Sequence, residues 1–211
     1  MYIPIHAALL PFLLFFVYSF MGVNPSGPHQ MLVYYTVGFV IVLAMMFRFL
    51  RASFSDFIGE FWRAVQAIIL GYVFYRTLSW AVALLLESFI TENDPNSEAI
   101  LGDIATNFKV MLVVTSVLAP IVEESIFRGA LFGTIHKKNR FAAYIVSVVV
   151  FGLFHLWDSM LFDFNWGLIL HLVLYFPPGI ALAWCYERSG TIWAPILLHS
   201  IMNLFISYSV K

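Results

Sequence analysis

Three short motifs place ionisable side chains inside long apolar stretches of the chain. They are EESIFR at 123–128, FGLFH at 151–155 and HSIMN at 199–203. A charged side chain at bilayer depth is costly, so it normally faces the interior of a helix bundle and is a candidate for function. Carboxylate, imidazole and amide groups can together carry acid–base chemistry, and the motifs therefore predict a catalytic site.

The first motif holds two adjacent acids that fall on different faces of a helix. Glu124 and Arg128 are four residues apart and can form an ion pair. Glu123 is rotated from Glu124 by about 100° and has no partner nearby in the sequence. A carboxylate without a fixed counter-ion in a low-dielectric site can act as a general base near neutral pH. The alternative is that both acids belong to a buried ion-pair network.

The other two motifs each place two groups on one helix face, because their members are four residues apart. Phe151 and His155 form one pair, and His199 and Asn203 form the other. His155 is either a hydrogen-bonded packing residue or part of the catalytic site. The imidazole of His199 and the amide of Asn203 could both donate to a developing oxyanion. The alternative for this pair is hydrogen bonding between helices.

The composition indicates that these motifs lie in a membrane. The chain has 211 residues, of which 62% are hydrophobic and 11% are charged. Soluble domains are about 45–50% apolar and about 25% charged. Mean hydropathy is +0.89. We therefore predict an all-α, polytopic integral membrane protein with about seven spans. The spans are expected at 4–22, 31–50, 64–88, 106–135, 141–157, 166–186 and 191–209.

Other sequence features narrow the classes of protein and site. The net charge of −1 and the lack of a basic run give no reason to expect nucleic-acid binding. The single cysteine, Cys185, excludes an intrachain disulfide and a cysteine-based zinc site. Residues 4–22 lack the basic start and the cleavage site of a signal peptide, so we interpret them as a span.

The basic residues predict the orientation of the chain in the membrane. They lie in the even-numbered loops, at Arg48, Arg51, Arg63, Lys137, Lys138, Arg140 and Arg188. Such residues are enriched on the cytoplasmic side, so the N-terminus is expected in the cytoplasm and the C-terminus on the opposite side. Residues 51–63 mix aromatic and charged side chains and are expected to lie along the interface as an amphipathic helix. Pro177 and Pro178, followed by Gly179, are expected to kink the sixth span.

Three of the ionisable residues are expected at a similar depth. Counted from the cytoplasmic ends of their spans, Glu123, His155 and His199 lie roughly 12–21 Å below the surface. They could therefore meet in one cavity. We interpret His171 and Arg76, the other ionisable residues within the spans, as packing or pairing residues.

The order and spacing of the three motifs resemble those of the CPBP family. This family, also called Abi, includes CAAX proteases and bacteriocin-processing enzymes. The resemblance covers about 105–206, and Pro120 and Gly129 on either side of the first motif agree with it. It implies a single membrane domain, 1–211, with variable N-terminal helices at 1–104 and a catalytic core at 105–206. It also implies that the motif-bearing helices form a conical cavity within the membrane.

The resemblance also implies a role for each motif residue. Glu123 would be the general base that activates a water, and His155 would position that water and shuttle its proton. His199 and Asn203 would form the oxyanion hole. The architecture of the site would be supported by Glu124, Arg128 and Phe151. A mechanism without metal or other cofactor is favoured. The alternative is zinc held by Glu123, His155 and His199, although no H-E-x-x-H occurs.

The favoured function is therefore an intramembrane endopeptidase of the glutamic type. Its expected substrate is a membrane-associated peptide or a lipidated protein, with a prenylated CAAX protein as one option, and its expected location is a prokaryotic cell membrane. Two alternatives stay open: a non-enzymatic binding or immunity protein of the same fold, and a small proton-coupled transporter. Asn203, one turn after His199, favours hydrolysis, because a proton relay does not need a paired-donor site.

Overall fold

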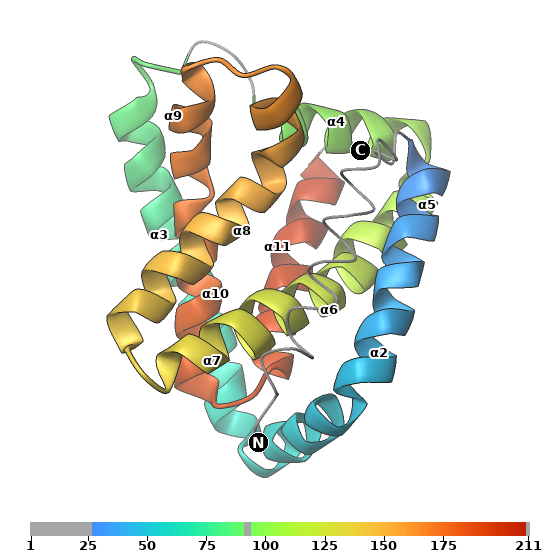
Figure 1. The fold of residues 1–211 in the computed structure, drawn as a ribbon, viewed down its shortest axis with the longest axis vertical. Helices are drawn as coiled ribbons and strands as arrows, with labels where there is room; N and C mark the ends of the chain where they lie inside the picture. Colours follow the sequence, from blue (N-terminus) through green and yellow to red (C-terminus); the bar gives the residue numbers. More distant parts are fainter. Residues whose placement is uncertain (1–26, 91–93, 210–211) are drawn as a thin grey trace.

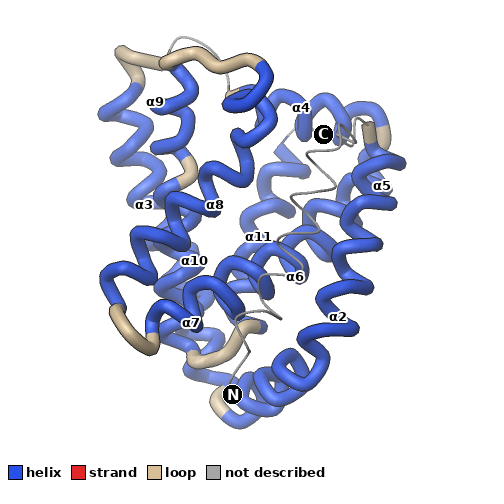
Figure 2. Tube along the Cα trace, in the orientation of Figure 1, coloured by secondary structure: helices blue, strands red, loops and turns tan. Residues whose placement is uncertain are grey.

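A computed structural model describes residues 27–90 and 94–209, and every regular element in these ranges is a helix (Figures 1 and 2). The α-helices are α2 (Pro28–Gly59), α3 (Phe61–Leu86), α4 (Pro95–Thr106), α5 (Phe108–Val113), α6 (Ala119–Glu124), α7 (Gly133–His136), α8 (Arg140–Phe162), α9 (Gly167–Leu174), α10 (Phe176–Ser189) and α11 (Trp193–Ser209). Two π-helical segments, Val114–Leu118 and Ser125–Phe132, lie on either side of α6. The all-α prediction is confirmed.

Five stretches are long and apolar enough to cross a membrane. They are Pro28–Gly59, Phe61–Leu86, Phe108–His136, Arg140–Phe162 and Gly167–Ser189. The last predicted span corresponds to α11, which has 17 residues. The first predicted span, 4–22, lies outside the described residues. The polytopic class is therefore confirmed, while the count of seven spans stays a prediction.

One predicted segment is divided between two helices. Residues 51–63 were expected to lie along the interface as an amphipathic helix, whereas α2 continues to Gly59 and α3 begins at Phe61. The position of this segment at the interface stays a prediction. No proline interrupts the chain between 29 and 59, so the helix continues past the end of its apolar stretch. The break comes at Glu60, whose φ of −114° and ψ of 34° leave the helical region.

Local side chains fix where several helices begin and end. The Asp94 carboxylate accepts from the backbone N–H of Ser97 and caps the start of α4. The Asn139 side chain does the same for α8. Gly190, with φ of +75°, ends α10 in the left-handed conformation that glycine adopts without strain.

The helix that carries the two acids is unusual because it widens twice. Between Phe108 and His136 the backbone is helical throughout, but α6 is bounded by the two π-helical segments. Pro120 has no N–H to donate, and the turn before it closes instead with a bond from Ala119 N–H to the carbonyl of Val114, five residues earlier. Such π-bulges occur often at functional sites. Here they displace the two acids from the regular α-helical register of the flanking turns.

The sixth predicted span is broken as expected. Tyr175 separates α9 from α10, and Pro177 and Pro178 follow in the first turn of α10. The bond from Gly179 N–H to the Tyr175 carbonyl is kept, so helical hydrogen bonding continues past the two prolines. The interruption at Tyr175 agrees with the prediction, while the kink itself stays a prediction.

The turns separate by charge (Figure 1). The turns at 59–61, 137–139 and 190–192 lie at the bottom of the view, and those at 87–90 and 163–166 lie at the top. Five basic residues lie in the bottom turns or within two residues of them: Arg63, Lys137, Lys138, Arg140 and Arg188. The segments 87–90, 94–106 and 163–166 hold five acids and no Lys or Arg. Alternate connections therefore lie at opposite ends of the bundle, as a multi-pass membrane protein requires.

Candidate active site

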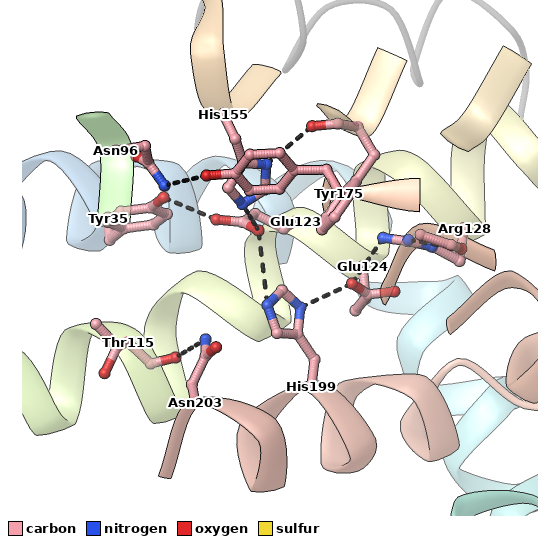
Figure 3. Close-up of polar contacts among 12 residues, drawn as sticks. Tyr35, Asn96, Thr115, Glu123, Glu124, Arg128, His155, Tyr175, His199 and Asn203 are labelled. Carbon is pink, nitrogen blue, oxygen red and sulfur yellow. Dashed lines mark hydrogen bonds and ion pairs between the residues drawn. The ribbon is translucent and has the colours of Figure 1, made fainter. Parts of the chain in front are cut away.

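Glu123, His155 and His199 converge from three helices, α6, α8 and α11 (Figure 3). The Oε2 atom of Glu123 lies 3.9 Å from Nε2 of His155 and 4.0 Å from Nε2 of His199. This oxygen is buried and accepts no hydrogen bond from the described residues. The expectation that the three residues meet is therefore borne out by their positions.

The hydrogen bonds of the two histidines determine which ring nitrogen faces Glu123. Nδ1 of His155 lies 2.8 Å from the carbonyl oxygen of Phe151, and Nδ1 of His199 lies 2.8 Å from Oε1 of Glu124. Both partners can only accept, so in each ring Nδ1 carries the proton. In the neutral rings Nε2 then presents a lone pair. Oε2 of Glu123 and the Nε2 atoms of His155 and His199 are therefore three acceptors that face the space between these side chains. A group that donates two hydrogens, such as water, matches this arrangement.

Glu124 has partners on both sides, unlike its neighbour. Its Oε1 accepts from Nη1 of Arg128 at 2.8 Å and from Nδ1 of His199 at 2.8 Å. Arg128 is fully buried, donates from Nη2 to the carbonyl of Gly179 and lies 4.4 Å above the ring of Phe151. The predicted Glu124–Arg128 pair is confirmed. The paired Glu124 carboxylate also orients the ring of His199. Sequence periodicity did not predict this second contact.

Phe151 occupies the centre of this arrangement. Its ring centroid lies 4.5 Å from that of His155 and 6.1 Å from that of His199. The same ring receives the Arg128 guanidinium on its face, a favourable contact of a cation with a π system. Its carbonyl fixes His155, so one residue holds both the ring position and the tautomer of that histidine.

Asn203 does not point into the gap. Its Nδ2 donates to the carbonyl oxygen of Thr115 at 2.7 Å, and no contact with Glu123 or His155 is found among the described residues. Thr115 belongs to the first π-helical segment, where the widened turn exposes a carbonyl. The oxyanion-hole role of Asn203 therefore stays a prediction, and it requires the amide to exchange this partner for substrate.

The structure adds two tyrosines that the motifs did not indicate. The hydroxyl of Tyr35 donates to Oε1 of Glu123 at 2.7 Å. The ring of Tyr175 lies against that of His155, with centroids 4.7 Å apart and planes inclined by 31°. Tyr175 also donates to Oδ2 of Asp94 at 2.5 Å and accepts from Asn96. Neither tyrosine carries a charge or belongs to one of the three motifs, so sequence reasoning had no reason to select them.

The remaining ionisable residues of the spans stay apart from this group. His171 is buried on α9, and Arg76 is exposed on α3. In the described ranges neither residue contacts Glu123. The prominent pocket, of about 300 Å³, is also elsewhere: it lies beside α7, lined by Phe49, Phe132, His136, Tyr186, Glu187 and others, and contains none of the predicted site residues.

The distances between Glu123, His155 and His199 are longer than those between the ligands of a zinc ion. Ligand atoms about 2.0–2.1 Å from tetrahedral zinc are about 3.3 Å from one another. The separations here are 3.9 and 4.0 Å, and within 27–90 and 94–209 no group of three His, Cys, Asp or Glu residues is arranged to hold a metal. As placed, the residues do not fit zinc. The metal-free mechanism itself stays a prediction.

Known proteins are similar to this chain. A family model described as type II CAAX prenyl endopeptidase Rce1-like matches residues 105–205. The "Putative membrane peptidase YdiL" of Bacillus subtilis is 29% identical over 95% of this chain and 82% of its own length. The "UPF0177 protein YxdF" of Lactococcus lactis is 25% identical over 68% of this chain and 76% of its own.

A third relative carries a more specific name. The "Membrane-embedded CAAX protease MroQ" of Staphylococcus aureus is 24% identical over 65% of this chain and 55% of its own length. No solved structure matches the chain. The matched region contains all three motifs, and its first and last residues agree closely with the predicted core at 105–206. The chain is therefore similar to CAAX-protease-like membrane proteins, in agreement with the resemblance of its motifs to those of the CPBP family.

Proposed function

We propose that this membrane protein is an intramembrane endopeptidase in which Glu123 activates a water molecule. The observation that carries the proposal is the buried, unpartnered Oε2 of Glu123 facing two imidazole nitrogens. A water oxygen about 2.8 Å from each acceptor fits separations of this size. Such a water could donate one hydrogen to Glu123 and the other to a histidine.

The proposed first step moves one proton and forms one bond. The water oxygen attacks the carbonyl carbon of the scissile peptide bond while a water proton passes to Oε2 of Glu123. His155 accepts a hydrogen bond at Nε2 and so directs the water lone pair toward the substrate. A base held within hydrogen-bond reach of the proton that it removes is the requirement for this chemistry.

The negative charge that develops on the carbonyl oxygen needs donors. His199 can supply one only when both ring nitrogens carry protons, because Nδ1–H is already bonded to Glu124. The Glu124 carboxylate stabilises such an imidazolium, which then donates from Nε2. Asn203 would supply the second donor after releasing Thr115. Hydrogen-bond donors directed at a developing oxyanion are usually the largest single contribution to lowering the barrier.

The second step breaks the C–N bond. The proton taken by Glu123 passes to the leaving nitrogen, with His155 as the carrier, and the new carboxylic acid keeps the second water proton. The base is then free again. Microscopic reversibility requires that the group that removed the proton in one direction can return it in the other.

The substrate that this site would take is associated with the membrane. Glu123 and His155 lie on helices that are long and apolar enough to span a bilayer. One relative is named as a CAAX protease, and the matching family model is named for a CAAX prenyl endopeptidase. We therefore propose a membrane-associated peptide or lipidated protein, with a prenylated CAAX protein as one member of the class.

The test compares Glu123→Gln with the wild-type chain in native membranes. Gln keeps the size of the side chain and an acceptor for Tyr35, but it cannot accept the water proton. Membrane-associated peptides are compared by mass spectrometry for size and C-terminus. We expect at least one product to disappear and its precursor to accumulate. Glu60→Gln, at the exposed turn between α2 and α3, is the matched control. If Glu123→Gln changes no peptide, binding without hydrolysis becomes the better account.

A further inference from the structure

Tyr35 reaches the candidate base from α2, a helix outside the region that the family model matches. The match begins at residue 105, and α2 spans Pro28–Gly59. The Tyr35 side chain is 7% exposed, and its hydroxyl donates to Oε1 of Glu123 at 2.7 Å (Figure 3). A residue of the N-terminal half therefore contacts the group on which the proposed chemistry depends.

This contact makes the two oxygens of Glu123 different. Oε1 accepts the phenolic hydrogen bond, and Oε2 accepts none from the described residues. Oε2 is also the oxygen that lies within 4.0 Å of both histidines. The hydrogen bond opposes rotation of the carboxylate, so the oxygen with a free lone pair is the one that faces the gap. Hydrogen bonds to a charged group are about twice as strong as those between neutral groups.

The packing around Tyr35 holds its ring in place. Tyr34 meets it edge to face, with centroids 5.2 Å apart. One turn later on α2, Gly38 faces Val122, the residue before Glu123. A Cβ at Gly38 would lie 3.3 Å from Cγ1 of Val122, so the missing side chain allows α2 and α6 to approach closely. The position of the Tyr35 hydroxyl is therefore set by contacts on both sides of it.

We propose that Tyr35 is a positioning residue of the hydrolysis, which fixes the Glu123 carboxylate so that Oε2 acts as the base. The inference depends on the proposed function, because positioning has a meaning only if Glu123 takes a proton. It extends that function by making α2 part of the site. The N-terminal half then supplies a residue of the site.

The test is Tyr35→Phe in the full-length chain, purified in detergent. The substrate is the peptide that accumulates in the Glu123→Gln membranes. Phe keeps the ring and its packing and removes only the hydroxyl. We expect kcat to fall about 10- to 100-fold, the equivalent of one lost hydrogen bond to a charged group. KM should change less than about twofold, because the interaction does not involve bound substrate.

Two further variants separate positioning from a general loss of structure. Tyr72→Phe removes the hydroxyl of a partly buried tyrosine on α3, which packs against Phe205, and should leave kcat unchanged. Gly38→Val should push α2 from α6 and lower kcat in the same direction as Tyr35→Phe. The kcat of each variant is calculated per folded molecule. Folding is assessed from the elution position of the purified protein and from its unfolding midpoint.

The outcomes distinguish this inference from the function on which it depends. If Glu123→Gln abolishes cleavage but Tyr35→Phe keeps the wild-type kcat, positioning is refuted and the protease proposal stands. A rise in KM with kcat unchanged would assign Tyr35 to substrate binding instead and would equally refute positioning. If Glu123→Gln alters no peptide, both proposals fail together.

Discussion

At the scale of single residues, the two adjacent acids differ in their partners. Glu124 shares one oxygen between Arg128 and His199, whereas Glu123 accepts from a tyrosine and leaves its second oxygen unpaired. The carboxylate of Glu124 and the guanidinium of Arg128 are both fully buried. Removing one member of a buried ion pair leaves the other charge without compensation. The acids should therefore respond differently to the same substitution.

Glu124→Gln is expected to destabilise the protein by about 3–5 kcal/mol, because Arg128 keeps its charge in a buried site. Glu123→Gln, which keeps the Tyr35 hydrogen bond and breaks no close ion pair, should cost about 1 kcal/mol or less. Denaturant unfolding of the purified proteins in micelles measures both. Equal losses for the two variants would contradict the separate roles given to the acids.

At the scale of elements, α4 is linked to the site through one chain of contacts. Asp94 caps the start of α4 and accepts from Tyr175, whose ring lies against His155. The same carboxylate oxygen, Oδ2, serves both the cap and the tyrosine. The order of this short helix and the position of the His155 ring are therefore coupled.

Asp94→Ala should loosen α4, since losing an N-cap costs about 0.5–2 kcal/mol. Hydrogen–deuterium exchange of peptides from 95–106 should become faster, and exchange in α11 should stay as in the wild type. Glu98→Gln, on the exposed side of the same helix, keeps the cap and is the control. Unchanged exchange in the Asp94 variant would show that α4 is held by other contacts.

A second element-scale prediction concerns the approach of α8 to α9. A Cβ at Gly152 would lie 2.7 Å from Cδ1 of Leu172 and 3.3 Å from Cβ of Tyr175. Gly152→Val should therefore displace the Tyr175 ring from His155 and cost about 1–3 kcal/mol of overpacking. Gly59→Ala is the control, because a Cβ there meets nothing within 4 Å. A Gly152→Val protein as stable as the wild type would show that Leu172 and Tyr175 can move aside.

At the scale of the whole molecule, the arrangement of turns agrees with the charge distribution. The turns that hold the basic residues lie at one end of the bundle, and the acidic segments lie at the other (Figure 1). Lysine and arginine are enriched on the cytoplasmic side of membrane proteins. The basic end is therefore proposed to face the cytoplasm.

A reporter fused after Lys211 should be active on the non-cytoplasmic side. A second fusion that ends at Gly190, in the turn between α10 and α11, should report the cytoplasm. The pair differs by one helix, so opposite readings are expected whichever reporter is used. Identical readings would show that α11 does not cross the membrane, and exchanged readings would reverse the orientation.

The sequence by itself determined the features that depend on composition and local spacing. Hydropathy predicted the helical membrane class, the four-residue interval predicted the Glu124–Arg128 pair, and the two prolines predicted the break before α10. These features follow from the chemistry of residues close together in the chain. The motif order predicted a resemblance to the CPBP family, and the region that the family model matches contains those motifs.

Only the tertiary structure decided which side chains complete the site. Tyr35 is 88 positions from Glu123, and Tyr175 is 81 positions from Asp94. Contacts at such separation depend on helix packing, and helical periodicity gives the face of each helix without its partner. Helical periodicity also did not predict the partner of Asn203. Its spacing placed it on the same helix face as His199, but its amide donates to the carbonyl of Thr115 in the first π-helical segment. The local pattern therefore indicated the candidate base, and the packing of α2, α8 and α11 around α6 determines which of its oxygens faces the histidines.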